Sequence, residues 1–539
     1  MSMFLQFDNE YLTTKNCGVR IMEQKRAGCN DRAQLREKTV MRHFYPIVLF
    51  SKFFISGGSR RRCLLSAGMI ALFASAMPAA AQQSVPCASP PPATPALTIS
   101  PQMFNDVCIP AGFGGNPIAY FDDFSWRAFL ALVWPAQQDQ RGKPDTALAP
   151  GAAGKPTVFE TFKADWEIFQ PNGQDPAPNW KDYSGDNPCG VANVVFGDVM
   201  LASFSKFSNL GMAGFGPKLT GALVAQNGTY VRYAVNFNES EFTTIMAKKA
   251  YLRASLANPV SFDSGAIDTK AAWIDMKGVA NPGRYYTRQA MLFDLEANAC
   301  TKTTVGLVGF HIVVKTASRP QWIWTSFEHI DNVPSAGAPG PFTFNNGSGT
   351  PMPSANPIPF PIPLKAPPPY NVERQKPIHA STATTNTKYR DALKAAGSPF
   401  QFYQLVMTQW PRDANSPQQA GSPNFTFPGV APPGFPPPPF DATAFSNTTL
   451  ETFEQKEIAR GCMNCHNLTR SKTDFLWSVM TRAHPSILQI PAAPPPAPLA
   501  MRLSGQAAPA PNAVTQGLPP DQAEAFEALK GLLEIKPGK

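Results

Sequence analysis

Two cysteines and a histidine stand close together in the C-terminal part of the sequence. Cys462, Cys465 and His466 form the pattern C-x-x-C-H. Two thiols at this spacing can add to the two vinyl groups of one porphyrin, and the adjacent imidazole can then bind the iron from one side. The pattern therefore predicts a covalently attached c-type haem, with Cys462 and Cys465 as attachment residues and His466 as the proximal iron ligand.

A cysteine pair of this spacing also occurs in thioredoxin-like redox sites and in zinc sites. A zinc site would need further Cys or His ligands nearby, and only His484 follows His466. A thioredoxin-like motif would need a surrounding βαβ pattern, which the sequence lacks. We therefore expect one haem c rather than zinc or a thiol redox pair.

Haem is attached outside the bacterial inner membrane, so this prediction requires an export signal. Three arginines at 60–62 precede an apolar run at 63–77, and three alanines end at Ala81. This is the form of a cleavable signal peptide, whereas an apolar run that spans a bilayer needs about 20 residues. We expect cleavage after Ala81 and a periplasmic location, with no transmembrane segment in the mature chain. The arginine run is also loosely similar to a twin-arginine signal. Residues 1–40 have no place in a signal peptide, which indicates that the start codon is set too early.

The positive charge of the sequence lies mainly in this leader. Residues 1–81 hold 12 of the 47 basic and 5 of the 38 acidic side chains, so the net charge of +9 falls to +2 without them. Nucleic-acid binding needs a basic footprint on the folded domain. We therefore expect no nucleic-acid partner.

Proline clusters divide the chain. We expect a proline-rich approach at 82–115, a domain at 116–410 with a proline-rich excursion at 334–370, a linker at 411–439 and a haem domain at 440–539. Extended connectors are the usual structure of such proline-rich stretches.

Four cysteines remain after the leader and the haem motif. In an oxidising compartment four thiols favour two disulfides, and proximity in the sequence favours Cys87 with Cys108 and Cys189 with Cys300. Buried, unpaired thiols are the alternative.

The pattern of apolar residues predicts the elements of the larger domain. Apolar residues recur at intervals of three and four positions between Asp123 and Pro135, which predicts an amphipathic helix. A second helix is expected at 240–256. Asn227-Gly228 stands between two alternating runs, which is a strong hairpin signal. Further strands are expected at 266–276, 284–295, 305–315 and 321–328. These elements predict a mostly antiparallel β domain with a few helices.

Two histidines of this domain form a possible second site. His311 and His329 lie on neighbouring predicted strands, and pairing of these strands would let His311 approach Glu328 or His329. Such a cluster can bind a metal or transfer protons. The alternative is that both histidines are structural and hydrogen-bonded.

The last hundred residues contain two predicted helices. Thr448 with Glu451 is a capping box, and Pro519 opens a second helix that ends near Lys536. Together with the C-x-x-C-H motif, these helices resemble class I c-type cytochromes over residues 440–539. A wider similarity to exported bacterial mono-haem proteins rests on motifs such as Gln321-Trp322-Ile323-Trp324 and Asn447 to Glu451, and brings no known activity for the larger domain. The expected fold is therefore α+β: a mostly antiparallel β domain followed by an all-α class I cytochrome c-like domain.

The residue opposite His466 decides what such a haem does. A methionine or histidine ligand is typical of an electron-transfer centre, whereas an open position permits small ligands to bind. The resemblance places the ligand on the proline-rich stretch between the two helices, and therefore at Met501. His484 and Met480 are the alternatives.

These features predict periplasmic electron transfer through a single haem to a redox partner protein. The alternative is a haem-dependent oxidoreductase or peroxidase-like enzyme with a substrate pocket in the β-rich domain.

Overall fold

The computed structural model describes part of the chain. The described residues are 91–99, 106–110, 113, 117–170, 172–183, 187–192, 194, 196–202, 222–334, 340–348, 358, 363–410, 447–455, 462, 466 and 469–485. The predicted leader, the linker at 411–439, the helix after Pro519, and Cys87, Cys465 and Met501 lie outside them.

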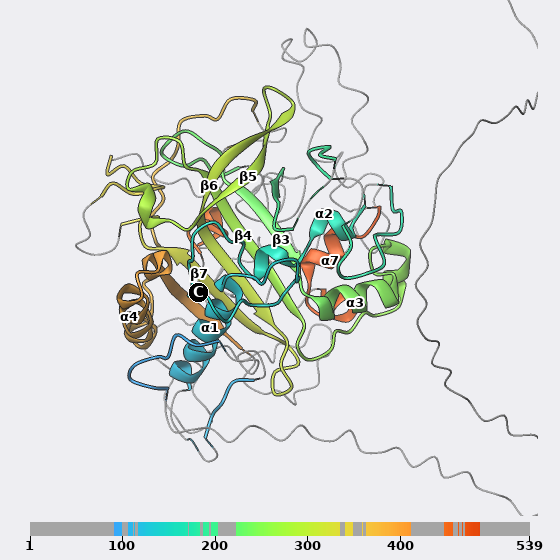
Figure 1. Cartoon of the computed structure of the whole chain (residues 1–539), viewed down its shortest axis with the longest axis horizontal. Coiled ribbons are helices and arrows are strands. Elements are labelled where there is room, and N and C mark those ends of the chain that lie inside the picture. The colour runs from blue at the N-terminus through green and yellow to red at the C-terminus, as the bar shows by residue number, and fades with distance from the viewer. Residues whose placement is uncertain are drawn as a thin grey trace, which may run out of the picture. The chain divides into compact units, whose positions relative to one another are not determined.

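A curled, mixed sheet is the centre of the described structure (Figure 1). Its eight strands run in the order β1-β3-β4-β6-β5-β2, and β7 joins β6 to β8. All pairings are antiparallel except that of β2 with β5. The strands are β1 (Lys163–Ala164), β2 (Val199–Leu201), β3 (Arg232–Phe237), β4 (Ile267–Asp275), β5 (Thr287–Asp294), β6 (Ala299–Val314), β7 (Ile323–His329) and β8 (Tyr403–Gln409).

The two faces of the sheet carry different apolar clusters because side chains alternate along each strand. On β6, Phe310 and Ile312 pack with helix α1, whereas Val313 belongs to a cluster on the opposite face with Trp324 and Trp477. The strands predicted around β4, β5, β6 and β7 are confirmed. The hairpin signal is confirmed as well, since the amide of Gly228 donates to the carbonyl of Ala225 at 2.8 Å.

Helices α1 (Ile118–Val133) and α4 (Ala380–Ala395) lie side by side on one face (Figure 1). Side chains of the two helices pack against each other there. Trp126 of α1 stacks on Tyr389 of α4 with ring centroids 5.0 Å apart, and its Nε1 donates to Oδ1 of Asn386 at 3.0 Å. α1 ends before Pro135, which cannot continue a helix. The prediction of this helix is confirmed, whereas α4 was not predicted.

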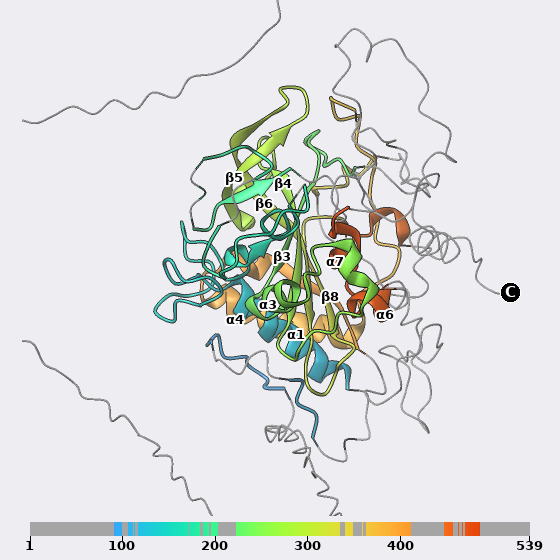
Figure 2. The same cartoon turned by 90° about the vertical axis from the view of Figure 1, so that its right-hand side faces the viewer.

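The other face is covered by α3 (Glu239–Lys248), α6 (Arg470–Thr473) and α7 (Trp477–Arg482). Figure 2 shows α6 and α7 on the opposite side of the sheet from α4. The remaining short helix, α2 (Asp165–Ile168), follows β1 at the sheet edge.

The prediction of an all-α cytochrome c-like domain is wrong for the described residues. Instead, the C-terminal segment, by which we mean described residues 447–485, packs directly on the sheet. Leu450 joins a cluster with Val308 of β6, and the side chain of Asn447 donates to the carbonyl of Phe327 at 2.7 Å. The physical reason is size: α6 and α7 have four and six residues, so they cannot bury a core of their own and share that of the sheet.

Cys189 and Cys300 form a disulfide with Cα atoms 5.4 Å apart, which confirms this predicted pair. Cys87, the predicted partner of Cys108, lies outside the described residues. In the described part of the chain, no helix is both long and apolar enough to cross a membrane.

Candidate haem-attachment site

His466 is held by a backbone carbonyl. Its Nδ1 lies 2.6 Å from the carbonyl oxygen of Phe475. A carbonyl oxygen only accepts hydrogen bonds, so Nδ1 must carry the proton. The neutral imidazole then has its lone pair on Nε2, which is the nitrogen that can bind a metal.

Aromatic and apolar side chains lie beside His466. The ring of Trp324 on β7 lies 4.2 Å from the imidazole, measured between centroids, at an interplanar angle of 54°. Trp324 is buried, and Phe475, Leu476 and Trp477 belong to the same apolar cluster. The imidazole therefore faces an apolar environment that excludes water from one side.

Cys462 is anchored to the last strand. Its backbone amide donates to Oε1 of Gln409 at 2.9 Å, and its side chain packs against Val406 and Met407. The strand register explains why both anchors occur together, because Trp324 of β7 is paired directly with Gln409 of β8. Two neighbouring strands thus hold the two ends of the C-x-x-C-H motif.

Sequence reasoning found Cys462 and His466 from their spacing but missed Trp324, Gln409 and Phe475 as their partners. No signal in the sequence links Trp324 or Gln409 to the C-x-x-C-H motif, since they lie 142 and 57 positions before His466. The two described alternatives for the sixth ligand lie in different surroundings. Met480 belongs to the apolar cluster against which Cys462 packs, and His484 lines a pocket.

His311, Glu328 and His329 do not come together as one cluster. The register places His311 opposite Ser326, on the face that also carries Glu328, whereas His329 points to the other face of β7. His311 instead lies 3.4 Å from a carboxylate oxygen of Glu451 in the C-terminal segment.

The other two residues of that predicted cluster are structural. The buried carboxylate of Glu328 forms an ion pair with Arg374 and accepts from the hydroxyl of Thr448 at 2.8 Å. His329 stacks on Tyr285 at 3.9 Å, and burial lowers its pKa to about 4. At pH 7 this histidine is neutral, and both of its ring nitrogens already have backbone partners, the carbonyl of Arg284 and the amide of Asp331.

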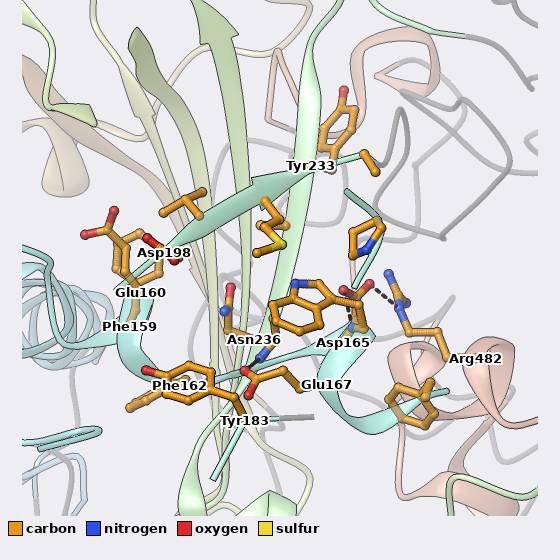
Figure 3. Close-up of a pocket in the computed structure, with 18 of the residues that line it drawn as sticks. Phe159, Glu160, Phe162, Asp165, Glu167, Tyr183, Asp198, Tyr233, Asn236 and Arg482 are labelled. Carbon is orange, nitrogen blue, oxygen red and sulfur yellow. Dashed lines mark hydrogen bonds and ion pairs between the residues drawn. The ribbon is translucent and has the colours of Figure 1, made fainter. Parts of the chain in front are cut away.

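A pocket of about 220 Å³ opens at the edge of the sheet, beside β1 and α2 (Figure 3). Two ion pairs lie within its wall. Arg141 contacts Glu167 at 2.7 Å, and Arg482 contacts Asp165 at 2.8 Å. Behind this wall, burial lowers the pKa of Lys163, although the carboxylate of Glu167 opposes this shift. No sequence motif pointed to this pocket.

No group of three or more His, Cys, Asp or Glu side chains that could hold a metal ion occurs among the residues that the structure describes. Comparison of the chain with protein-family models, with curated proteins and with solved structures gave no match.

Proposed function

We propose that this protein is an exported electron carrier with one c-type haem attached to Cys462 and Cys465 and ligated by His466. The single observation that carries the proposal is the hydrogen bond between His466 Nδ1 and the carbonyl of Phe475, at 2.6 Å. It selects the tautomer that an axial histidine needs, in a segment whose cysteine spacing is that of haem attachment.

The described residues around the motif fit such a group. When bound, a c-type haem supplies a one-electron iron couple. The chain's own contribution is to hold the imidazole through Phe475, to cover it with Trp324 and to fix the amide of Cys462 through Gln409. An apolar surrounding of this kind favours a raised reduction potential, because it disfavours the more highly charged oxidised state.

The predicted leader supports the location, and the small net charge of +2 in the rest of the chain argues against a nucleic-acid partner. A signal peptide ending at Ala81 would deliver the protein to the periplasm. Electron carriers meet their redox partners through small, weak interfaces, so we propose a periplasmic redox protein as the partner.

Intact-protein mass spectrometry tests the attachment. The exported wild-type protein should carry the mass of one haem, which survives denaturation because it is covalently bound. Replacement of both attachment residues, Cys462→Ala with Cys465→Ala, should abolish the added mass. Cys462→Ala alone should leave at most one thioether bond. His379→Ala, at the N-cap of α4, is the control and should keep the full mass. A wild-type protein without added mass, from a strain with working haem attachment, contradicts the proposal.

The pocket at the sheet edge gives the oxidoreductase alternative a specific place. Its 220 Å³ could hold a small substrate beside Asn236, which projects from β3 toward the pocket in Figure 3. If the protein is such an enzyme, peroxide-dependent oxidation of a small phenol should be lost in Asn236→Phe while the haem spectrum stays unchanged. Equal turnover by the variant rejects this pocket as the substrate site.

A further inference from the structure

We infer that Asp474 is the positioning residue that aims the carbonyl of Phe475 at Nδ1 of His466. The inference rests on the proposed function, because it assigns a role toward the axial histidine. Asp474 touches neither the imidazole nor a reacting atom. It acts through the backbone of Phe475, the residue that follows it.

The backbone at this point has an unusual conformation. Asp474 and Phe475 both have left-handed φ angles, of 48° and 75°. Aspartate tolerates this region, but for a bulky residue such as phenylalanine it is costly, and such conformations persist only where the surroundings impose them. The Phe475 carbonyl that accepts from His466 is therefore set by a backbone that needs external support.

The side chain of Asp474 provides one part of that support. Its Oδ2 accepts a hydrogen bond from the backbone amide of Phe262 at 2.9 Å and forms an ion pair with Lys315. Asp474 and Lys315 are both buried. Charge-assisted bonds between buried groups are stronger than those between neutral ones, so this carboxylate is well suited to fix a strained turn.

The backbone of Asp474 provides the other part. Its carbonyl oxygen accepts from Nε1 of Trp322 at 2.9 Å. Trp322 is completely buried and itself has a left-handed φ of 71°. Three segments, carrying Phe262, Lys315 and Trp322, thus converge on one residue from positions more than 150 residues earlier in the chain.

The consequence concerns the electronic character of the histidine as well as its position. A hydrogen bond from Nδ1 raises the basicity of the imidazole, which would favour the oxidised state of a haem iron held by His466. Weakening the support of Phe475 should weaken this bond and raise the midpoint potential. A purely structural role for Asp474 would change stability without this effect.

The test uses the full-length exported protein and three variants. Asp474→Ala removes the carboxylate and disfavours the left-handed conformation. Asp474→Asn keeps one acceptor for Phe262 and tolerates that conformation, but loses the ion pair with Lys315. Asp263→Ala is the matched control, because Asp263 directly follows Phe262 in the connection before β4 and its side chain is exposed.

Two quantities are measured: the midpoint potential, and the rate at which the Nδ1 proton of His466 exchanges with deuterated solvent, followed by NMR. In Asp474→Ala we expect a higher potential and exchange that is about tenfold faster, the factor that corresponds to one ordinary hydrogen bond. Asp474→Asn should show a smaller change in both, and Asp263→Ala none. Wild-type potential and exchange in Asp474→Ala overturn the inference.

Two further outcomes are also decisive. If Asp474→Ala does not fold, Trp322→Phe, which keeps an aromatic ring but removes the indole donor to Asp474 and part of the buried ring, should give the same two changes, and wild-type values there reject the inference. If the wild-type protein carries no haem, the proposed function fails separately. Nitrogen-15 NMR of the full chain then still reports whether Asp474→Ala moves the proton of His466 from Nδ1 to Nε2, and an unmoved proton overturns the inference.

Discussion

The indole of Trp324 and the imidazole of His466 lie 4.2 Å apart, although 142 positions separate them in the sequence. This contact joins the haem-attachment motif to a central strand of the sheet. If a haem is attached there as proposed, the large β-structure would form part of its environment, unlike a carrier domain that is tethered to an independent neighbour.

Replacement of Trp324 should therefore affect both stability and redox properties. Trp324→Ala leaves a cavity beside His466 and should lower the free energy of unfolding by about 3–5 kcal/mol. Water entering the cavity should also lower the midpoint potential, because it stabilises the oxidised state. Trp324→Phe should keep most of both properties. Denaturant unfolding and a redox titration measure the two effects, with the partly exposed Trp166→Ala as control. An unchanged potential in Trp324→Ala contradicts a role beside the haem.

Asp122 should make stability depend on pH. It is completely buried on α1, where it accepts hydrogen bonds from Thr382 of α4 and Thr408 of β8, and burial raises its pKa to about 7. The folded state therefore keeps a proton that the unfolded chain releases above about pH 4, so this group lowers stability as the pH rises from about 4 to about 7. We expect Asp122→Asn to remove a pH-dependent difference of up to about 4 kcal/mol.

The measurement for Asp122 is denaturant unfolding of the wild type and of Asp122→Asn across this pH range. The difference between the two proteins isolates the titration of Asp122 from that of all other groups. A difference that stays constant with pH shows that Asp122 titrates at an ordinary pKa.

The disulfide between Cys189 and Cys300 closes a long loop, with a sequence separation of 111. Cross-links that close long loops restrict the unfolded chain most, so replacing both cysteines by alanine should lower the free energy of unfolding by about 2–4 kcal/mol. The haem spectrum should stay unchanged, since neither cysteine lies at the attachment motif. Equal stability of the variant and the wild type, with one fewer disulfide by thiol counting, would refute the predicted contribution.

The sequence predicted those elements whose apolar pattern is local. α1 and strands β4 to β7 follow periods of 3.6 and 2, and these patterns were visible. α4 was missed because the side chains that it buries include Thr382, Thr385 and Asn386, which leave no apolar stripe. Its burial depends on hydrogen bonds to α1 and β8, which no local pattern shows.

The candidate site also combines features with a local sequence signal and features without one. Cys462 and His466 stand out in the sequence because attachment chemistry requires adjacent positions in the chain. The docking of the C-terminal segment does not, because it depends on pairs such as Asn447 with Phe327 and Trp322 with Asp474, more than 100 residues apart. The resemblance to class I cytochromes predicted an independent all-α domain in place of this docking, and for the described residues that expectation was wrong.

The most direct test of the account is the optical spectrum of the exported protein, oxidised and reduced, with and without carbon monoxide. We predict a red protein with the sharp reduced bands of a c-type haem, which stay with the polypeptide on denaturation and do not shift with the gas. A shift of the reduced bands with carbon monoxide would contradict the proposal of an electron carrier and favour that of an oxidoreductase. A colourless protein, in which Cys462 and Cys465 both react with an alkylating reagent, would contradict the haem itself.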